Sequence, residues 1–102
     1  MSYAEVDAAI QQWSAANALV LFTNFAGREA RFCYLSSERG ECLQISVSPP
    51  EFGRVRVGVW DVETIDDEVI QELWEVSPAE VRAALDAALA HAREWLGRHR
   101  HE

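Results

Sequence analysis

Turn-forming residues recur at short intervals through the middle of the chain. Gly27 in "FAGRE", Gly40 in "SERGE" and residues 49–53 in "SPPEFG" mark three turns between residues 18 and 62. The segments between the turns are rich in β-branched and aromatic residues, and the first of them, "ALVLFTNF", is too short for a typical helix. This spacing predicts four strands joined by three hairpins in an antiparallel meander.

Apolar residues at helical spacing precede this meander. Val6, Ile10 and Trp13 fall on one face of a helix, and Ser2 followed by Glu5 fits a capping box. We therefore expect a first helix that begins near the N-terminus and continues through about residue 16.

A second helix is expected near the C-terminus. Ser77 suits the N-cap, Pro78 the first turn and Glu80 the third helical position. The apolar residues that follow are spaced alternately by four and three residues, and Gly97 is a stop signal after Leu96. The composition of residues 64–76 fits a helix or a strand, and we favour a fifth strand because a helix there would run directly into the next one.

These elements predict an α+β fold: a four- or five-stranded antiparallel meander with an N-terminal helix and a long C-terminal helix packed on it. The length of 102 residues and the hydrophobic content of 49% are sufficient for one core without disulfide or metal. We expect one domain over residues 1–102, with residues 97–102 as a frayed tail.

Side chains alternate between the two faces of a strand, so the turn positions decide which residues form the core. Centring the second turn on Arg39 and Gly40 places Tyr34 opposite Ile45, and Ile45 opposite Val57, on one apolar face. The other face is then mostly polar, with an apolar patch of Val20, Phe22, Cys33 and Leu35 at its first-strand end. A patch of this size needs a cover, which is either a second copy of the chain or one of the two terminal helices.

Both cysteines are expected to be free thiols. The predicted register places Cys33 opposite Ser46 and Cys42 opposite Ser37, roughly 13 Å apart along the ladder at about 3.3 Å per residue. A disulfide requires Cα atoms within about 7 Å. Cys33 also lacks an adjacent base in the sequence, so we interpret it as an inert apolar side chain.

Three arginines form the candidate site for a small anion. The predicted register gathers Arg31, Arg54 and Arg56 on the second face of the sheet, beside serine and glutamine side chains. The alternative is a solvated polar face in which these arginines form local ion pairs.

Acidic residues are concentrated between Asp61 and Glu80, where eight carboxylates occur without any basic residue. The segment "DVETIDDEVIQE" contains no glycine at the position where a calcium loop bends. Two interpretations remain: a solvated acidic loop, or an acidic contact surface for a basic partner that includes Asp66, Asp67 and Glu68.

The net charge of the chain and its lack of targeting signals narrow the expected partners and the expected cellular compartment. The net charge of −8 at pH 7 repels nucleic acid and anionic lipid. No apolar run is long enough for a membrane span, and the N-terminus lacks a signal-peptide pattern, so we expect a cytoplasmic protein. Catalytic and phosphate-binding motifs are absent from the sequence, and we expect neither a metal nor another cofactor.

A helix, an antiparallel sheet and a helix in a small acidic chain resemble the bacterial secretion chaperones, and the size and acidity are similar to those of some toxin-immunity proteins. This resemblance implies a basic or partly unfolded protein partner. Our leading hypothesis is a non-catalytic protein-binding or adaptor domain, homodimeric, with Val20, Phe22, Leu35, Asp66, Asp67 and Glu68 at its interfaces. The competing hypothesis is a domain or enzyme that binds an anionic small molecule through Arg31, Arg54 and Arg56.

Overall fold

A computed structural model of the chain describes residues 3–36, 42–61 and 69–99. The elements in chain order are α1 (Asp7–Ala16), β1 (Phe22–Phe25), β2 (Arg28–Ser36), β3 (Cys42–Val47), β4 (Val55–Asp61), β5 (Val69–Val76), a 3₁₀ turn (Pro78–Glu80) and α2 (Val81–His99). The five strands form one antiparallel sheet in the order β1-β2-β3-β4-β5. The predicted α+β meander is therefore confirmed, and the fifth strand is present.

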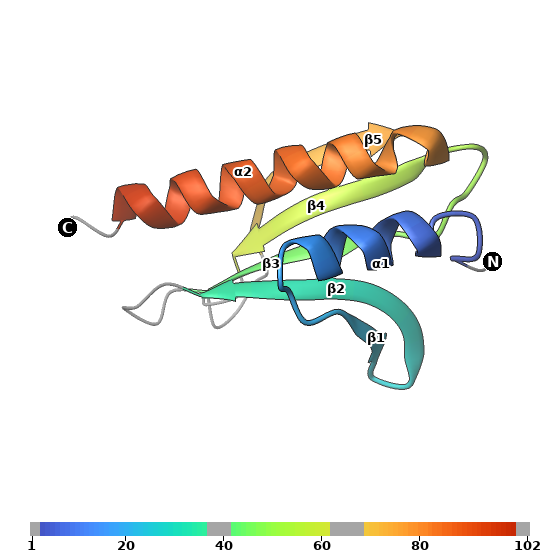
Figure 1. The fold of residues 1–102 in the computed structure, drawn as a ribbon, viewed down its shortest axis with the longest axis horizontal. Helices are drawn as coiled ribbons and strands as arrows, with labels where there is room; N and C mark the ends of the chain where they lie inside the picture. The colour runs from blue at the N-terminus through green and yellow to red at the C-terminus, as the bar shows by residue number, and fades with distance from the viewer. Residues whose placement is uncertain (1–2, 37–41, 62–68, 100–102) are drawn as a thin grey trace.

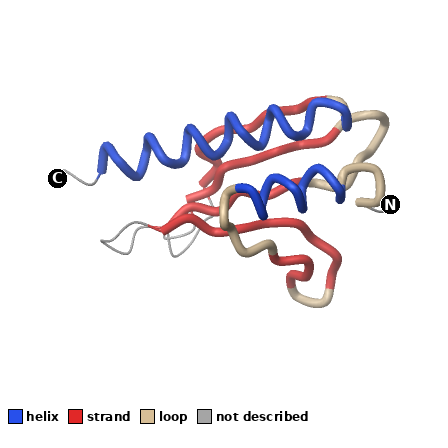
Figure 2. Tube along the Cα trace, viewed as in Figure 1, coloured by secondary structure: helices blue, strands red, loops and turns tan. Residues whose placement is uncertain are grey.

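Both helices lie on the same face of the sheet (Figure 1). α2 runs along β4 and β5, and α1 lies beside α2 in front of β2 and β3, so that helices and sheet make two layers (Figure 2). We call the covered side the helix face. The opposite side has no described helix or strand packed on it, and we call it the open face.

The core fills the space between the helices and the helix face. Every strand residue in this core that belongs to β2, β3 or β4 has an odd number, as expected for alternating side chains. These residues are Cys33, Leu35, Leu43, Ile45, Val47, Val55, Val57 and Val59. The helices supply Ile10, Trp13, Leu85, Ala88 and other apolar residues at helical spacing.

α1 begins later than the sequence predicted. The carbonyl of Tyr3 accepts hydrogen bonds from the backbone N–H groups of Val6 and Asp7, which makes a separate turn before the helix. The Tyr3 hydroxyl donates to the carbonyl of Val47 at 2.9 Å, so the side chain is fixed in the core. Ser2, the predicted cap, lies outside the described residues.

β1 is shorter than the predicted first strand because the end of α1 holds the residues before it. The N–H of Leu19 donates to the carbonyl of Ser14 at 2.9 Å, and the N–H of Ala18 to the carbonyl of Ala15 at 3.2 Å. Ala18 has a φ of +54°, the left-handed conformation of a Schellman-type helix end. The first residue that pairs with β2 is Phe22, opposite Phe32.

The register between β2 and β3 corrects the sequence-based prediction by one residue. Tyr34 pairs with Gln44 and Cys33 with Ile45, so Tyr34 lies on the open face while Ile45 and Val57 lie in the core. The last pair before the turn, Ser36 with Cys42, leaves an odd number of residues, 37–41, between the strands. A shift of one residue turns every side chain of a strand to the other face. Cys33 and Leu35 are consequently core residues, not members of an exposed patch.

The register between β3 and β4 also differs from the prediction, but by two residues, which leaves the faces unchanged. Val47 pairs with Val57, and Glu51 and Arg54 bridge a tight turn at Phe52 and Gly53. The N–H and carbonyl groups of Glu51 and Arg54 bond each other at 2.9 Å. This hairpin extends beyond the sheet.

The start of α2 confirms the predicted cap. The Ser77 hydroxyl and backbone N–H both donate to Glu80 Oε1, at 2.7 and 3.3 Å. These bonds from Ser77 lower the pKa of Glu80. Because the folded-state pKa is depressed, this contribution to stability is complete above the ordinary glutamate pKa and is lost as the pH falls through the lowered one.

α2 continues through Gly97 to His99, three residues beyond its predicted end at Leu96. Within the described residues, no helix combines the length and the apolar character needed to cross a membrane.

The β1–β2 turn offers a direct test of the hairpin geometry. Ala26 and Gly27 have φ values of +54° and +82°, as in a type I′ turn, and alanine is strained there. We predict that Ala26→Gly raises the free energy of unfolding by about 0.5–1 kcal/mol in urea denaturation. Ala30→Gly, inside β2, is the control and should lower it by about 0.5–1 kcal/mol. Destabilisation by both changes would contradict the turn geometry.

Candidate functional site

Four aromatic rings form a continuous cluster on the open face at β1 and β2. Phe22 stacks on Phe32 with ring centroids 5.3 Å apart, and Tyr34 and Phe25 contact Phe32 edge-on at 5.6 and 5.9 Å. Phe32 is buried by its neighbours, whereas Phe22, Phe25 and Tyr34 remain 42%, 55% and 38% exposed. We call these four residues the aromatic cluster. Their mutual ring contacts hold the four side chains against one another.

Trp60, near the end of β4, extends its indole over the middle of the open face, against Gly58 and Ser46. Its indole N–H donates to the Ser46 hydroxyl at 2.8 Å. A Cβ atom on Gly58 would lie 2.8 Å from the indole nitrogen, closer than atoms can approach. Gly58 is therefore the residue that lets the indole lie close against the sheet.

Two shallow hollows flank Trp60. One, of about 190 Å³, lies between Trp60 and the aromatic cluster, with Phe25, Phe32 and Gln44 in its lining. The other, of about 310 Å³, lies toward β5, with Gly58, Arg56 and Leu73 in its lining. The open face is thus an uneven surface with an aromatic ridge, a central indole and a depression on each side.

The β4–β5 half of the open face combines Leu73 with an exposed ion pair. Leu73 is 44% exposed. Arg56 lies 3.6 Å from Glu75, and both side chains are more than half exposed, so water screens the pair. The guanidinium of Arg56 remains accessible to solvent.

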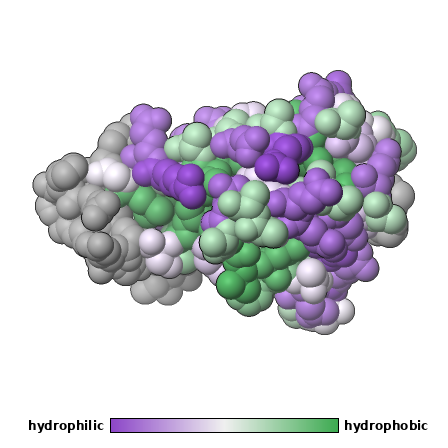
Figure 3. Space-filling view, in the orientation of Figure 1, coloured by the Kyte–Doolittle hydropathy of each residue, from purple (hydrophilic) through white to green (hydrophobic). Residues whose placement is uncertain are grey.

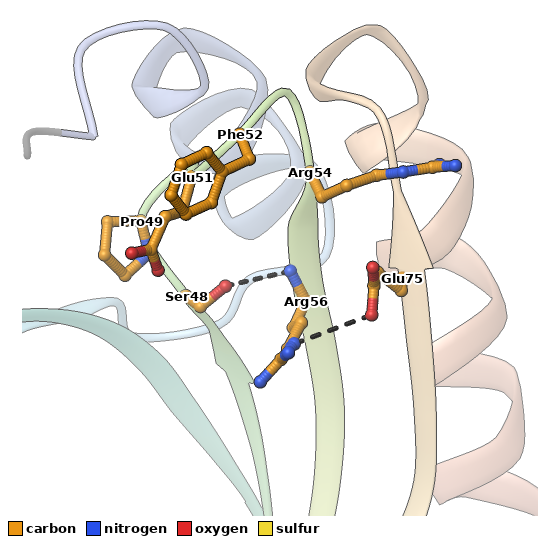
Figure 4. A pocket seen from close by; sticks show the side chains of 7 residues that line it. All are labelled: Ser48, Pro49, Glu51, Phe52, Arg54, Arg56 and Glu75. Atoms are coloured by element: carbon orange, nitrogen blue, oxygen red, sulfur yellow. Dashed lines mark hydrogen bonds and ion pairs between the residues drawn. The ribbon is translucent and has the colours of Figure 1, made fainter.

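A third hollow, of about 310 Å³, lies where the β3–β4 hairpin leaves the sheet (Figure 4). Arg54 and Arg56 both line it, but their side chains point in different directions, and Arg56 Nε is paired with Glu75 (Figure 4). Glu51 and Glu75 also line it, so the four charged residues balance. This hollow does not present a cluster of free positive charges for an anion.

Arg31, the third predicted anion ligand, has a structural role. Its side chain is only 10% exposed on the helix face, and its Nε and Nη2 donate to both carboxylate oxygens of Asp7, at 2.7 and 3.1 Å. Nη1 donates to the carbonyl of Ala30, and the guanidinium stacks 4.4 Å from the ring of Tyr3. The hydrogen bonds to Asp7 raise the pKa of Arg31 further. The predicted three-arginine cluster is therefore wrong, because Arg31 and Arg56 lie on opposite faces.

The predicted interface residues divide into three groups. Phe22 is an exposed member of the aromatic cluster, and Val20, two residues before it, is 70% exposed. Leu35 is buried in the core because of the register shift. Asp66, Asp67 and Glu68 lie outside the described residues.

Both cysteines are free, as predicted. Cys33 is buried in the core, and this burial raises the pKa of its thiol to about 12. A thiol that stays protonated at neutral pH is a poor nucleophile, so Cys33 belongs to the packing of the core.

The open face differs in charge from the whole chain. Among charged residues in the described strands, the register places Arg28, Arg56 and Glu75 on this face. The face thus has a small positive excess, although the chain carries −8. The helix side is mostly hydrophilic, with a hydrophobic area near the connection from α1 to β1 (Figure 3).

Comparisons of this chain with family models, with curated proteins and with solved structures find no match.

The arrangement of Gly58 and Trp60 can be tested by adding one methyl group. We predict that Gly58→Ala displaces the indole, breaks its bond to Ser46 and lowers stability by about 1–3 kcal/mol. The Trp60 indole N–H resonance in a ¹H–¹⁵N spectrum should shift strongly. Ser46→Ala removes the acceptor without crowding the ring, so it should move the same resonance with a smaller stability loss. An unchanged Trp60 resonance in Gly58→Ala would refute this geometry.

The Arg31–Asp7 pair should contribute to folding, not to ligand binding. Asp7→Asn removes the closer of the two carboxylates that pair with the poorly exposed guanidinium of Arg31 and leaves only Glu29, at 3.4 Å. We predict a loss of about 1–3 kcal/mol in urea denaturation. The exposed pair of Arg82 and Asp86 is the control, since Asp86→Asn should cost only a few tenths of a kcal/mol, roughly. Equal effects of the two changes would contradict the structural role of Arg31.

Proposed function

We propose that this chain is a non-catalytic protein-binding domain whose contact surface is the open face of its sheet. The observation that carries the proposal is the aromatic cluster, whose rings pack against one another and stay partly exposed on a sheet face that no described helix covers. A contiguous apolar surface of this kind on a small domain is typical of an interaction site.

The composition of the face supports a protein partner in preference to a small ligand. Protein interfaces are enriched in tyrosine, tryptophan, phenylalanine and arginine and depleted in charged groups at their centre. The open face has Phe22, Tyr34, Trp60 and Arg56, and its central positions are Gln44 and Ser46. Its hollows are shallow depressions spread over the strands, whereas small-molecule sites usually enclose most of the ligand.

Rigid side chains make the surface suited to binding. The rings of the aromatic cluster pack against one another, and the Trp60 indole is fixed by its bond to Ser46. Side chains that are ordered in the free protein lose little entropy in the complex. The aromatic cluster and Trp60 can therefore make contact with little rearrangement of their own side chains.

The test compares two open-face variants with one helix-side variant. Tyr34→Glu and Leu73→Glu place a charge in the proposed contact surface, and Ala83→Glu adds the same charge on an exposed position of α2. Circular dichroism first establishes that all three are folded. In affinity capture followed by cross-linking mass spectrometry, the protein contacts of the wild type should persist in Ala83→Glu and weaken at least about tenfold in the open-face variants.

Cross-links that avoid β1, β2, β4 and β5, or equal capture by all three variants, would overturn the proposal. Contacts between copies of this chain count as protein contacts in this experiment, so it does not depend on the identity of the partner.

A further inference from the structure

We infer that the open face binds a second copy of this chain, sheet against sheet, in a two-fold symmetric dimer with the helices outside. This inference rests on the proposed function and specifies the partner. Three properties of the face support it: its charge, its two unlike halves and its size.

The charge of the face permits self-association. Two chains of net charge −8 repel each other at long range, so a homodimer must form through a surface from which the acidic excess is absent. Arg28, Arg56 and Glu75 give the described part of the open face a small positive excess. Among the described strand residues, two copies that approach through this face bring no cluster of carboxylates together.

The two halves of the face are chemically complementary. The β1–β2 half presents aromatic rings, and the β4–β5 half presents Leu73 and the exposed guanidinium of Arg56. A two-fold axis parallel to the strands places β1–β2 of one copy over β4–β5 of the other. Each aromatic cluster then faces Leu73 and Arg56 of the other copy, with which it can make apolar and cation–π contacts. The two-fold symmetry makes this contact at two equivalent places in the interface.

The size of the face meets the requirement for a reversible dimer. Five strands about 4.8 Å apart, with roughly six residues each at about 3.3 Å, span roughly 480 Å². Two such faces bury roughly 1,000 Å², without the additional area of side chains that project from the sheet. This area is near the lower limit for a specific interface. We therefore expect a weak dimer with a dissociation constant in the micromolar range.

Salt dependence distinguishes a second copy from a basic partner. Added salt screens the repulsion between two acidic chains, so the dissociation constant of the homodimer should fall as NaCl is raised from about 50 to about 500 mM. A complex with a basic protein should weaken over the same range. Because the two dissociation constants change in opposite directions with salt, this measurement separates a homodimer from a complex with a basic protein.

The experiment is sedimentation equilibrium of the purified full chain from about 5 to about 500 µM at both salt concentrations. The wild type should be a monomer–dimer mixture. Leu73→Glu and Tyr34→Glu should each raise the dissociation constant at least about tenfold, and Ala83→Glu should change it by less than about twofold. If Tyr34→Glu fails to fold, Leu73→Glu at the other half of the face decides the question.

An isotope-filtered NOE spectrum of mixed labelled and unlabelled chains then tests the axis. Contacts between the rings of Phe22 or Tyr34 in one copy and the Leu73 methyl groups of the other are expected. A strict monomer at the highest concentration, or a dimer insensitive to the open-face variants, overturns the second copy. Open-face-dependent capture of a different protein would then leave the proposed function standing, and its absence would remove both.

Discussion

The packing of two helices on one side of a five-stranded sheet determines the rest of this structure. A sheet has two faces, and the chain has two described helices, which lie side by side on the helix face. The core that they form with the odd-numbered strand residues drives folding through burial of apolar surface. Tyr3 and Asp7 connect α1 to the sheet, through Val47 and Arg31. As a consequence, no described helix covers the open face, and its apolar side chains can be shielded from water only by one another or by another molecule.

β2 shows why that consequence is difficult to read from the sequence. Cys33 and Leu35 on one side of the strand are matched by Phe32 and Tyr34 on the other, so both faces of β2 are apolar and alternation does not identify the core. The deciding variable is the number of residues in the turn after Ser36, and a turn with one glycine is compatible with an even or an odd count. An error of two residues at the β3–β4 hairpin had no effect on the faces, whereas an error of one at the β2–β3 turn exchanged them.

Features that depend on local chemistry were predictable, and features that depend on tertiary pairing were not. The cap at Ser77 and Glu80, the end of α1 near Ala16 and the existence of β5 follow from neighbouring residues. The pairing of the Arg31 side chain depends on Asp7, which is distant in sequence and becomes its partner only when α1 packs on the sheet. The candidate site has the same origin. The Trp60 indole lies close against the sheet because Gly58 lacks a side chain and because the Ser46 hydroxyl, on another strand, accepts a hydrogen bond from the indole N–H. A glycine two residues before a tryptophan in a strand was the available signal.

The distribution of charge connects the fold to the proposed interaction. Net charge keeps a small domain soluble, but it also opposes any association between copies. Removing the acidic excess from one face allows both properties in one molecule, because repulsion acts at long range and apolar contact acts only when the faces meet. The exposed Arg56–Glu75 pair fits this arrangement, since a screened surface pair contributes little to stability and leaves Arg56 free to exchange its partner for an aromatic face. The weak association expected from a face of this size is then balanced against repulsion, so ionic strength becomes the variable that controls it.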